Sequence, residues 1–253
     1  MANTRTVTLV KPIRVTFTGA DSSCSVDSLI GLLEEAPGLE LAFLYSEARQ
    51  GSGRYPPAAW IRETVETIEQ CIGPGRVALH VCGRVRLRFL DSGEVNPELG
   101  NLDRFARIQL NGKLTREHAD AVETMLRAHP ERRIIVQYEH STDLRAALPP
   151  FGSALQVLFD ASGGRGRLRT SWPQPLVGHV CGYAGGLGPE NIARELPRIA
   201  AAALGMQYWI DMEGQLRGGQ DHFIVERARK VLQELAQMEF GEPAIPSKRA
   251  VGM

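Results

Sequence analysis

The chain has 253 residues, enough for one large domain or two small ones at about 150 residues per domain. Hydrophobic residues make up 43% and charged residues 23%, which is typical of a globular protein and excludes a largely disordered chain. The 29 basic and 29 acidic residues cancel, which removes the electrostatic case for a nucleic acid or an anionic membrane as partner.

The sequence shows no sign of a segment that would direct it into or across a membrane. No stretch near the N-terminus resembles a secretion signal, and no run is apolar over the roughly 18 positions of a membrane span. The four cysteines are scattered and form no CxxC pair. These features predict reduced thiols in a cytoplasmic protein that has no membrane partner.

Strand and helix patterns alternate along the chain. From the N-terminus, strands are expected at 13–19, 39–45, 76–82, 105–110, 133–138, 154–160, within 176–184 and at 207–211. Helices are expected between them at 26–36, 56–71, 115–128 (capped by Thr115), 142–147, 189–203 and 221–237, while residues 83–102 indicate a short or irregular helix.

The spacing of these elements predicts the fold class. Strands separated by helices, recurring about every 30 residues, indicate repeated βα units with parallel strands. Eight such units favour a single-domain α/β fold, a TIM (βα)8 barrel over residues 13–240, with an N-terminal extension at 1–12 and a C-terminal tail at 241–253. An open doubly wound sheet is the alternative. That fold usually has a GxGxxG motif after its first strand, where this chain has Gly19-Ala20-Asp21-Ser22-Ser23.

A barrel carries its functional groups in the loops at the C-terminal ends of its strands, and the sixth strand has a distinctive end. Asp160 ends this strand and precedes a glycine-rich loop that contains Gly163 and Gly164. Burial raises the pKa of such a carboxyl group, and the glycines let a ligand approach the backbone. Asp160 is therefore a candidate general acid or base, with a helix-capping or turn aspartate as an equal alternative.

The seventh and eighth strands end in segments that suit an anion. Gly185 and Gly186 precede Pro189, which begins a helix, and backbone N–H groups at a helix N-terminus bind anions. Barrels often hold phosphate after these two strands. Gly214 gives similar backbone access after the eighth strand. The neighbouring Glu213 places a negative charge there and counts against tight phosphate binding.

Two further patterns concern histidine, cysteine and arginine. His-Val-Cys-Gly occurs at 80–83 and again at 179–182, and two His–Cys pairs can in principle form a tetrahedral metal site. Packing in the layers of the barrel is the favoured explanation, so neither a metal nor a cofactor is predicted. Arg165, Arg167 and Arg169 form either a basic lid or a solvated loop. Polar residues near other strand ends are candidates for lining a ligand pocket: Gln109, Asn111, Gln137, Glu139 and His140.

Several of these segments together resemble the phosphoribosylanthranilate isomerases, barrel enzymes of tryptophan biosynthesis. The resemblance is specific at the fourth, sixth and seventh strands and looser elsewhere. The matching segments are Arg54-Tyr55-Pro56, Ile108-Gln109-Leu110-Asn111-Gly112, Leu158-Phe159-Asp160, Gly163-Gly164-Arg165-Gly166 with the later Trp172, and residues 184–191.

The resemblance implies an intramolecular oxidoreductase that performs an Amadori-type isomerisation of a small phosphorylated sugar derivative. Asp160 stands at the position of the family's general acid. Arg54, Gln109 and Asp211 are the expected substrate-binding residues. The glycines expected to bind phosphate are Gly163, Gly164, Gly185, Gly186 and Gly214.

The general base departs from the family pattern. Thr18 stands at the position of the catalytic cysteine, and Thr16 at that of a lysine. A threonine hydroxyl is too weak a base unless another group activates it, which makes Thr18 an altered catalytic position. Cys24, near the start of the first helix, is a less favoured substitute. The chain is expected to be an isomerase-like enzyme with an altered base. The alternative is a diverged, non-catalytic barrel that binds a small ligand or a protein, and the oligomeric state is left open.

Overall fold

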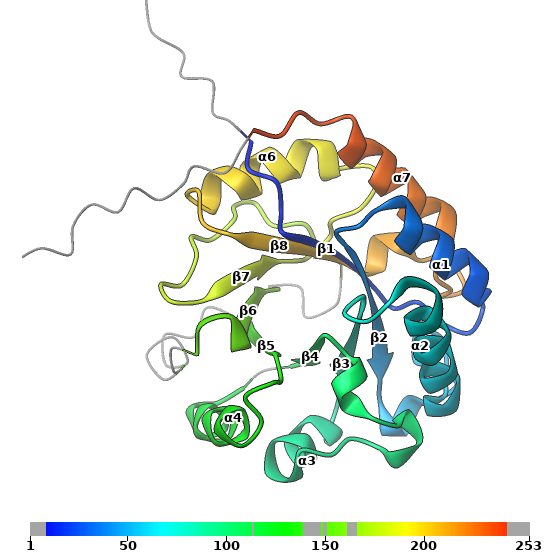
Figure 1. The fold of residues 1–253 in the computed structure, drawn as a ribbon. Helices are drawn as coiled ribbons and strands as arrows, with labels where there is room; N and C mark the ends of the chain where they lie inside the picture. Colours follow the sequence, from blue (N-terminus) through cyan, green and yellow to red (C-terminus); the bar gives the residue numbers. More distant parts are fainter. Residues whose placement is uncertain (1–8, 113, 139–147, 149–150, 161–165, 242–253) are drawn as a thin grey trace, which may run out of the picture.

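Eight parallel strands close into a barrel in the computed structural model, which describes residues 9–112, 114–138, 148, 151–160 and 166–241 (Figure 1). The strands are β1 (Arg14–Thr18), β2 (Leu39–Tyr45), β3 (Val77–Val81), β4 (Arg107–Leu110), β5 (Ile134–Tyr138), β6 (Leu155–Phe159), β7 (Val180–Tyr183) and β8 (Tyr208–Met212). Their spatial order follows the sequence, and β1 pairs with both β2 and β8. The predicted single-domain TIM (βα)8 barrel is confirmed. The open-sheet alternative is wrong because no strand is left at an edge.

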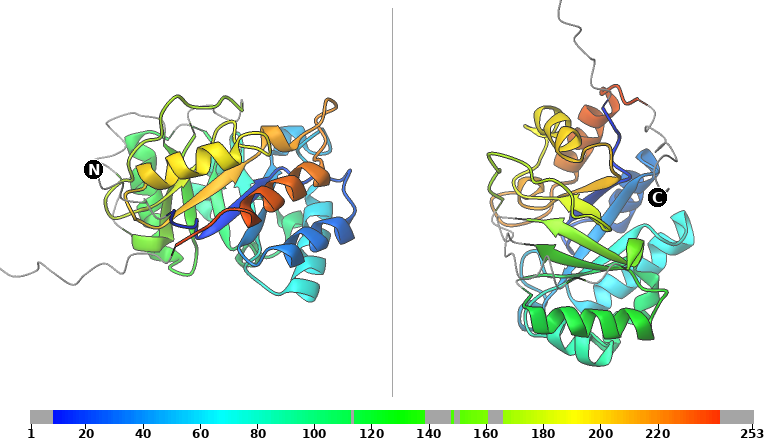
Figure 2. Two further views of the ribbon diagram at one scale, coloured as in Figure 1. Left: turned by 90° about the horizontal axis from the view of Figure 1, so that it is seen from above. Right: turned by 90° about the vertical axis from the view of Figure 1, so that its left-hand side faces the viewer.

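Helices cover most of the outer face of the barrel, while the described part of the chain between β6 and β7 contains no helix (Figures 1 and 2). Their apolar sides pack against the outward-facing strand residues, which together form the main hydrophobic core. A serine or threonine marks the start of two of them, because the hydroxyl of Ser25 accepts the Ser28 N–H at 3.2 Å and Thr115 forms a capping box with His118. The described helices are α1 (Val26–Glu35), α2 (Ala58–Ile72), α3 (Val85–Ser92), α4 (Arg116–Ala128), α6 (Ile192–Ala202) and α7 (Val225–Ala236).

Some predicted helix bounds need correction. The last helix begins at Val225 and not at Asp221, because Asp221 has a φ of 60° within a turn whose Gly218 N–H donates to the His222 carbonyl at 2.9 Å. The irregular region 83–102 contains the short helix α3 followed by single 3-10 turns. The helix expected at 142–147 lies outside the described residues.

The interior of the barrel is unusually polar at its N-terminal end. TIM barrels mostly fill this space with branched aliphatic side chains. Here the buried Glu40 on β2 forms an ion pair with Arg107 on β4, and the Thr16 hydroxyl donates to Glu40 at 3.1 Å. Arg107 also donates to the Gln156 side chain at 2.8 Å. The ion pair and these hydrogen bonds give each of the polar groups a partner. This pairing offsets the free-energy cost of burying them.

Trp209 on β8 fills the middle of the barrel. Its neighbour across the strand pair is Gly182, and a Cβ at that position would overlap the indole ring. The Arg107 guanidinium lies 4.1 Å from the centroid of the ring, within the range of a cation–π contact. Ile135 and Leu158 pack beside the indole. Side chains therefore fill the barrel below the C-terminal ends of its strands.

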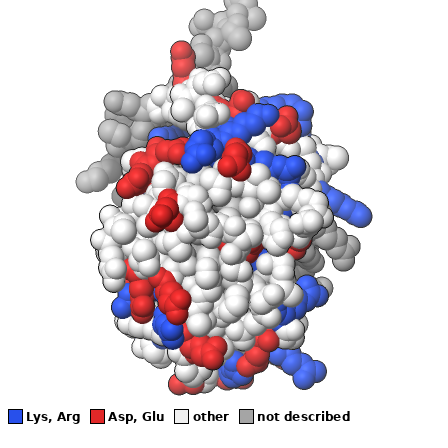
Figure 3. Space-filling model, turned by 90° about the vertical axis from the view of Figure 1, so that its right-hand side faces the viewer, with Lys and Arg blue, Asp and Glu red and all other residues white. Residues whose placement is uncertain are grey.

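The two ends of the described part of the chain meet beside the barrel. Val10 pairs with Gly241 in an isolated parallel bridge, and the Tyr208 hydroxyl donates to the Val10 carbonyl at 2.6 Å. The division into 1–12, 13–240 and 241–253 remains a prediction, since residues 1–8 and 242–253 lie outside the described part. Acidic and basic side chains are interspersed on the face seen in Figure 3. Among the described residues, no helix is long and apolar enough to span a membrane.

Candidate active site

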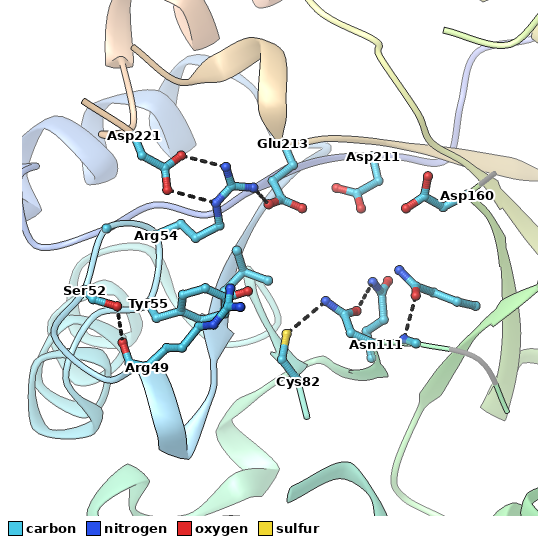
Figure 4. Close-up of a pocket in the computed structure, with 15 residues that line it drawn as sticks. Arg49, Ser52, Arg54, Tyr55, Cys82, Asn111, Asp160, Asp211, Glu213 and Asp221 are labelled. Carbon is cyan, nitrogen blue, oxygen red and sulfur yellow. Dashed lines mark hydrogen bonds and ion pairs between the residues drawn. The ribbon is translucent and has the colours of Figure 1, made fainter. Parts of the chain in front are cut away.

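A cavity of about 720 Å³ lies where the C-terminal ends of the strands meet (Figure 4). This end is where barrels of this class carry their functional groups. The cavity brings together six of the residues predicted for the site or its pocket: Asp160, Arg54, Gln109, Asp211, Asn111 and Gln137. The other lining residues are Leu44, Arg49, Ser52, Gly53, Tyr55, Cys82, Gly112, Glu213 and Asp221.

Two carboxyl groups lie next to each other on one wall (Figure 4). Asp160 follows β6, Asp211 is part of β8, and each is 6% exposed. Burial, with further contributions from the charges of Glu213 and Asp160, raises the pKa of Asp211 to about 8 against a hydrogen bond from Thr18. At neutral pH, Asp211 is therefore mostly protonated and has a minor ionised form.

Thr18 on β1 is a hydrogen-bond partner of Asp211. Its hydroxyl donates a hydrogen bond of 2.6 Å to Oδ1 of Asp211, and the residue is fully buried. Thr18 does not line the cavity. The structure thus links the altered catalytic position to a carboxylate that does face the cavity, a link between residues 193 positions apart.

No thiol of the described residues offers an ionised sulfur to the cavity. Cys82 lines it, but burial raises the pKa of its thiol to about 11. Cys24 was named as a less favoured substitute for the base because a helix start can lower the pKa of a thiol. Burial raises the pKa instead, and its Sγ donates to the Phe223 carbonyl at 3.7 Å. Cys24 does not line the cavity.

Arg54 connects two loops across the top of the barrel. Its guanidinium pairs with Glu213 after β8 and with Asp221 in the following turn, where Nη2 lies 2.6 Å from Oδ1 (Figure 4). Sequence reasoning named Arg54 but missed Asp221, which it assigned to a helix. The Gly218-Gly219 pair just before Asp221 was the available signal for a turn.

A row of amides lines the cavity elsewhere, and one buried imidazole lies behind it. Gln109 donates to Asn111 Oδ1 at 2.7 Å and lies 3.3 Å from His80 Nδ1. Burial lowers the pKa of His80 to about 3, so the ring is neutral. Oε1 of Gln109 and Nε2 of His80 are buried and have no hydrogen-bond partner among the described residues. Gln137 accepts the Gly112 N–H at 2.6 Å.

The glycines expected to bind phosphate do not line the cavity in the described part of the chain. Gly185 and Gly186 are buried, and a Cβ on Gly186 would overlap the backbone of Leu168 in the loop after β6. A Cβ on Gly214 would lie 3.6 Å from Gly166 Cα. The loops after β6, β7 and β8 therefore pack tightly on one another. Gly163, Gly164 and Arg165 lie outside the described residues.

The repeated His-Val-Cys-Gly segments have different surroundings. His80 and Cys82 both lie on the inner side of the barrel, whereas Cys181 is part of the core between the barrel and its helices. His179 precedes β7 and lies 3.4 Å from the Leu155 carbonyl. The two segments therefore differ in which residue faces the interior of the barrel. Cys82 does so in the first segment, whereas Gly182 and not Cys181 faces Trp209 in the second. Among the described residues, no three His, Cys, Asp or Glu side chains form a group suited to a metal ion.

Two other predicted pocket residues, Glu139 and His140, lie outside the described part of the chain. Arg167 and Arg169 are described but do not line the cavity. The charge of Asp160 acts on Arg169, whose pKa burial lowers. The choice between a basic lid and a solvated loop for this segment stays a prediction.

Comparison with solved structures identifies the fold. Phosphoribosylanthranilate isomerase from Thermus thermophilus matches with a TM-score of 0.59 and 20% identity, over 88% of this chain and 98% of that one. TrpF from Jonesia denitrificans gives 0.58 and 15% over 88% and 97%. The isomerase from Thermotoga maritima gives 0.59 and 12% over 89% and 100%. No protein-family model and no curated protein matches the chain.

The likeness to these isomerases extends over nearly the whole of both chains, and it is a likeness of fold. Because one barrel fold supports many reactions, function has to be argued from the residues of the cavity.

Proposed function

We propose that this chain is an isomerase that moves a proton between adjacent carbons of a sugar-derived substrate, in an Amadori-type rearrangement. The observation that carries the proposal is the pair formed by Asp160 and Asp211 at the cavity wall, with Asp211 held at a pKa of about 8. General acid–base catalysis works best when the pKa of a group lies near the working pH. The likeness in fold to known isomerases supports the same class of reaction.

Asp211 is the general base in this proposal, and Thr18 is its positioning residue. A threonine hydroxyl at the position of the family's cysteine cannot itself remove a proton from carbon at neutral pH. It donates to Oδ1 of Asp211, which fixes that oxygen and leaves the carboxylate facing the cavity. The base has thus moved from the end of β1 to β8, while the residue at the old position keeps a supporting role.

Asp160 is the general acid. In the reacting form the two adjacent carboxyl groups hold one proton, which lies on Asp160 while Asp211 is ionised. Asp160 gives this proton to the ring oxygen of a glycosylamine, and the ring C–O bond breaks to leave an open-chain iminium ion. Asp211 then takes the proton from C2, the electron pair of that C–H bond forms the C1–C2 double bond, and the π electrons of the C1–N bond return to nitrogen to give a neutral enaminol. Protonation at C1 and loss of the enol proton give the aminoketose, so atoms and charge balance.

The phosphate of the substrate stays a prediction from the resemblance. It rests on Gly163, Gly164, Gly185, Gly186 and Gly214, and the described members of this set are packed against neighbouring loops. The proposal for the reaction does not depend on them, since the two carboxyl groups act on the carbons and ring oxygen of the sugar.

The reaction is tested by incubation in D2O with phosphoribosylanthranilate and, separately, with its dephosphorylated analogue. An isomerase that exchanges its proton with solvent places deuterium at C1 of the product, which NMR detects. We expect Asp160→Asn and Asp211→Asn each to reduce the rate at least about 100-fold, the usual contribution of one acid–base group. Glu94→Gln, a change on the exposed surface, is the matched control.

Complementation of a tryptophan auxotroph that lacks the isomerase tests the parental reaction in a cell. Growth that is lost in Asp160→Ala supports catalysis. Absence of deuterium uptake with both compounds, in a protein that folds normally, would favour the alternative of a non-catalytic binding barrel.

A further inference from the structure

Two buried polar atoms on neighbouring strands of the barrel have no hydrogen-bond partner among the described residues. They are Nε2 of His80 on β3 and Oε1 of Gln109 on β4. The two residues are paired in the register of these strands, and each is 1% exposed. A buried polar atom costs free energy unless it is paired, so folded proteins leave few of them without a partner. This pair marks a place where a ligand can supply one.

Gln109 is the member of the pair that lines the cavity. Its Nε2 donates to Oδ1 of Asn111 at 2.7 Å and lies 3.3 Å from Nδ1 of His80. An amide nitrogen only donates, so Nδ1 is the acceptor and the neutral imidazole carries its proton on Nε2. Both N–H groups of the Gln109 amide are then used. Its oxygen is the end of the amide that is left for a ligand.

The His80 ring can accept this hydrogen bond because it is neutral. Burial lowers its pKa to about 3, and the charge of Arg107 acts in the same direction against that of Glu40. The contact itself requires the same state, because a protonated ring would place an N–H against the N–H of Gln109. His80 does not line the cavity, so it acts on a ligand through Gln109.

Asn111 and Cys82 hold the Gln109 amide from its other side (Figure 4). Burial raises the pKa of the Cys82 thiol to about 11, so the sulfur keeps its proton and donates it to the His80 carbonyl at 3.7 Å. Nδ2 of Asn111 donates to the same sulfur at 3.2 Å. This bond turns Oδ1 of Asn111 toward Gln109. Both neighbours of Gln109 therefore present acceptors to its nitrogen and none to its oxygen.

We propose that Oε1 of Gln109 accepts a hydrogen bond from a sugar hydroxyl of the substrate, and that His80 is the positioning residue that sets the direction of this amide. The proposal rests on the isomerase function proposed above, because it takes the ligand to be a sugar derivative. A ligand that lacks this hydroxyl leaves the buried oxygen without a partner. A site of this kind discriminates strongly against the deoxygenated compound.

The role of Gln109 is tested by calorimetry with a probe that cannot isomerise, 1-anilino-1-deoxyribitol, and with three forms of it that each lack one hydroxyl, at C2, C3 or C4. We expect one of the three to bind at least about tenfold more weakly than the probe. Gln109→Met removes the acceptor and should abolish this difference. Gln70→Met makes the same change on the exposed surface of α2 and should preserve it.

His80→Leu tests the positioning role. Without Nδ1 the amide has no acceptor on that side to fix its direction, and the tenfold difference should fall below about threefold. His80→Asn should restore it, because an asparagine Oδ1 can take the place of Nδ1 as acceptor. The matched control is His179→Leu, which removes the buried histidine of the second His-Val-Cys-Gly segment, away from the cavity, and should leave the difference unchanged. Circular dichroism confirms that each variant is folded.

Nitrogen-15 NMR of histidine-labelled protein gives a direct readout of the parent chain. The signal that is missing in His80→Asn identifies the ring. We expect it to carry its proton on Nε2 and to remain neutral at about pH 5. A proton on Nδ1 overturns the proposal, because Gln109 would then turn its oxygen toward His80 and its nitrogen toward the ligand.

Equal losses of affinity in the parent and in Gln109→Met for all three deoxygenated probes contradict the proposal, as does a full tenfold difference in His80→Leu or a probe that does not bind. The two proposals fail separately. A difference that depends on Gln109, without deuterium uptake in the isomerase assay, contradicts the reaction alone. Deuterium uptake without such a difference contradicts the role of Gln109 and His80 alone.

Discussion

At the scale of single residues, Asp211 shows how a function can oppose stability. The unfolded chain exposes this carboxyl group to water, where its pKa is about 3.9. In the folded barrel, burial raises the pKa to about 8, and the Thr18 hydroxyl only partly compensates. Between these two values, folding requires Asp211 to keep a proton that it would lose in water. The same raised pKa makes the ionised form of Asp211 a stronger base than an exposed carboxylate.

The pH dependence of stability follows from these two pKa values. Between about pH 4 and pH 8 the folded state holds more protons than the unfolded state at Asp211, so its free energy of unfolding falls as the pH rises. The Asp211→Asn variant has no ionisable group at this position, so its free energy of unfolding lacks this pH-dependent contribution. We expect the variant to lose less stability than the parent between pH 5 and pH 8, in urea unfolding at both values.

The variant Thr18→Val provides a second test of the raised pKa of Asp211. Loss of the hydroxyl removes a hydrogen bond to the ionised form and raises the pKa of Asp211 further. The decline in stability should then continue to higher pH than in the parent. Parallel pH profiles for the parent and Asp211→Asn would contradict the raised pKa.

At the scale of elements, the packing of β7 against β8 depends on one missing side chain. Gly182 lies opposite Trp209, and the indole occupies the space that a Cβ would need. The ring in turn supports the Arg107 guanidinium, which pairs with Glu40. A glycine here is therefore a packing requirement of the interior and not a flexible joint.

Gly182→Ala should destabilise the protein by about 1–3 kcal/mol, the usual cost of overpacking a filled core. Gly31→Ala is the control. Gly31 lies inside α1 with no atom within 4 Å of the added Cβ, and alanine is favoured over glycine in a helix by roughly 0.5–1 kcal/mol. The two substitutions should shift the urea midpoint in opposite directions. A Gly182→Ala protein as stable as the parent would show that the indole can move.

At the scale of the whole molecule, the barrel is closed by side chains as well as by the β1–β8 pairing. Arg217, in the segment after β8, is 5% exposed and donates to the Gly19 carbonyl and the Asp21 carboxylate after β1. Arg54 joins the loop after β2 to the same segment. The first and last units of the chain are thus tied together around the mouth of the cavity.

Arg217→Met should lower the free energy of unfolding by about 3 kcal/mol, because the buried Asp21 then loses its opposite charge and keeps only the hydrogen bonds from Ser23 and Phe223. At this chain length each kcal/mol corresponds to a melting temperature about 2–4 °C lower. Arg229→Met removes an exposed arginine that pairs with Glu35, so it should melt close to the parent. Equal melting temperatures for the two variants would contradict the closure by Arg217.

The sequence could predict the fold and part of the site because both follow from regular spacing. Strands that recur about every 30 residues can close only in a few ways, and closure brings their C-terminal ends together. Asp160 and Gln109 were therefore predicted to approach one another from their places at strand ends, whereas Asp211 was named only through the resemblance. Arg54 was predicted only because its segment resembles that of the isomerase family, and its pairing with Glu213 and Asp221 was not predicted.

By itself, then, the sequence determined an α/β barrel with two carboxyl groups and several amides around its mouth. Only the tertiary structure decided which groups share a wall, how far each is buried, and which backbone N–H groups are already bonded. The tertiary structure thus decided the pKa of Asp211, the hydrogen bond from Thr18 and the close packing of the glycine loops. The physical reason is that charge interactions and solvation depend on distances between residues far apart in the chain, whereas strand and helix patterns depend on neighbours.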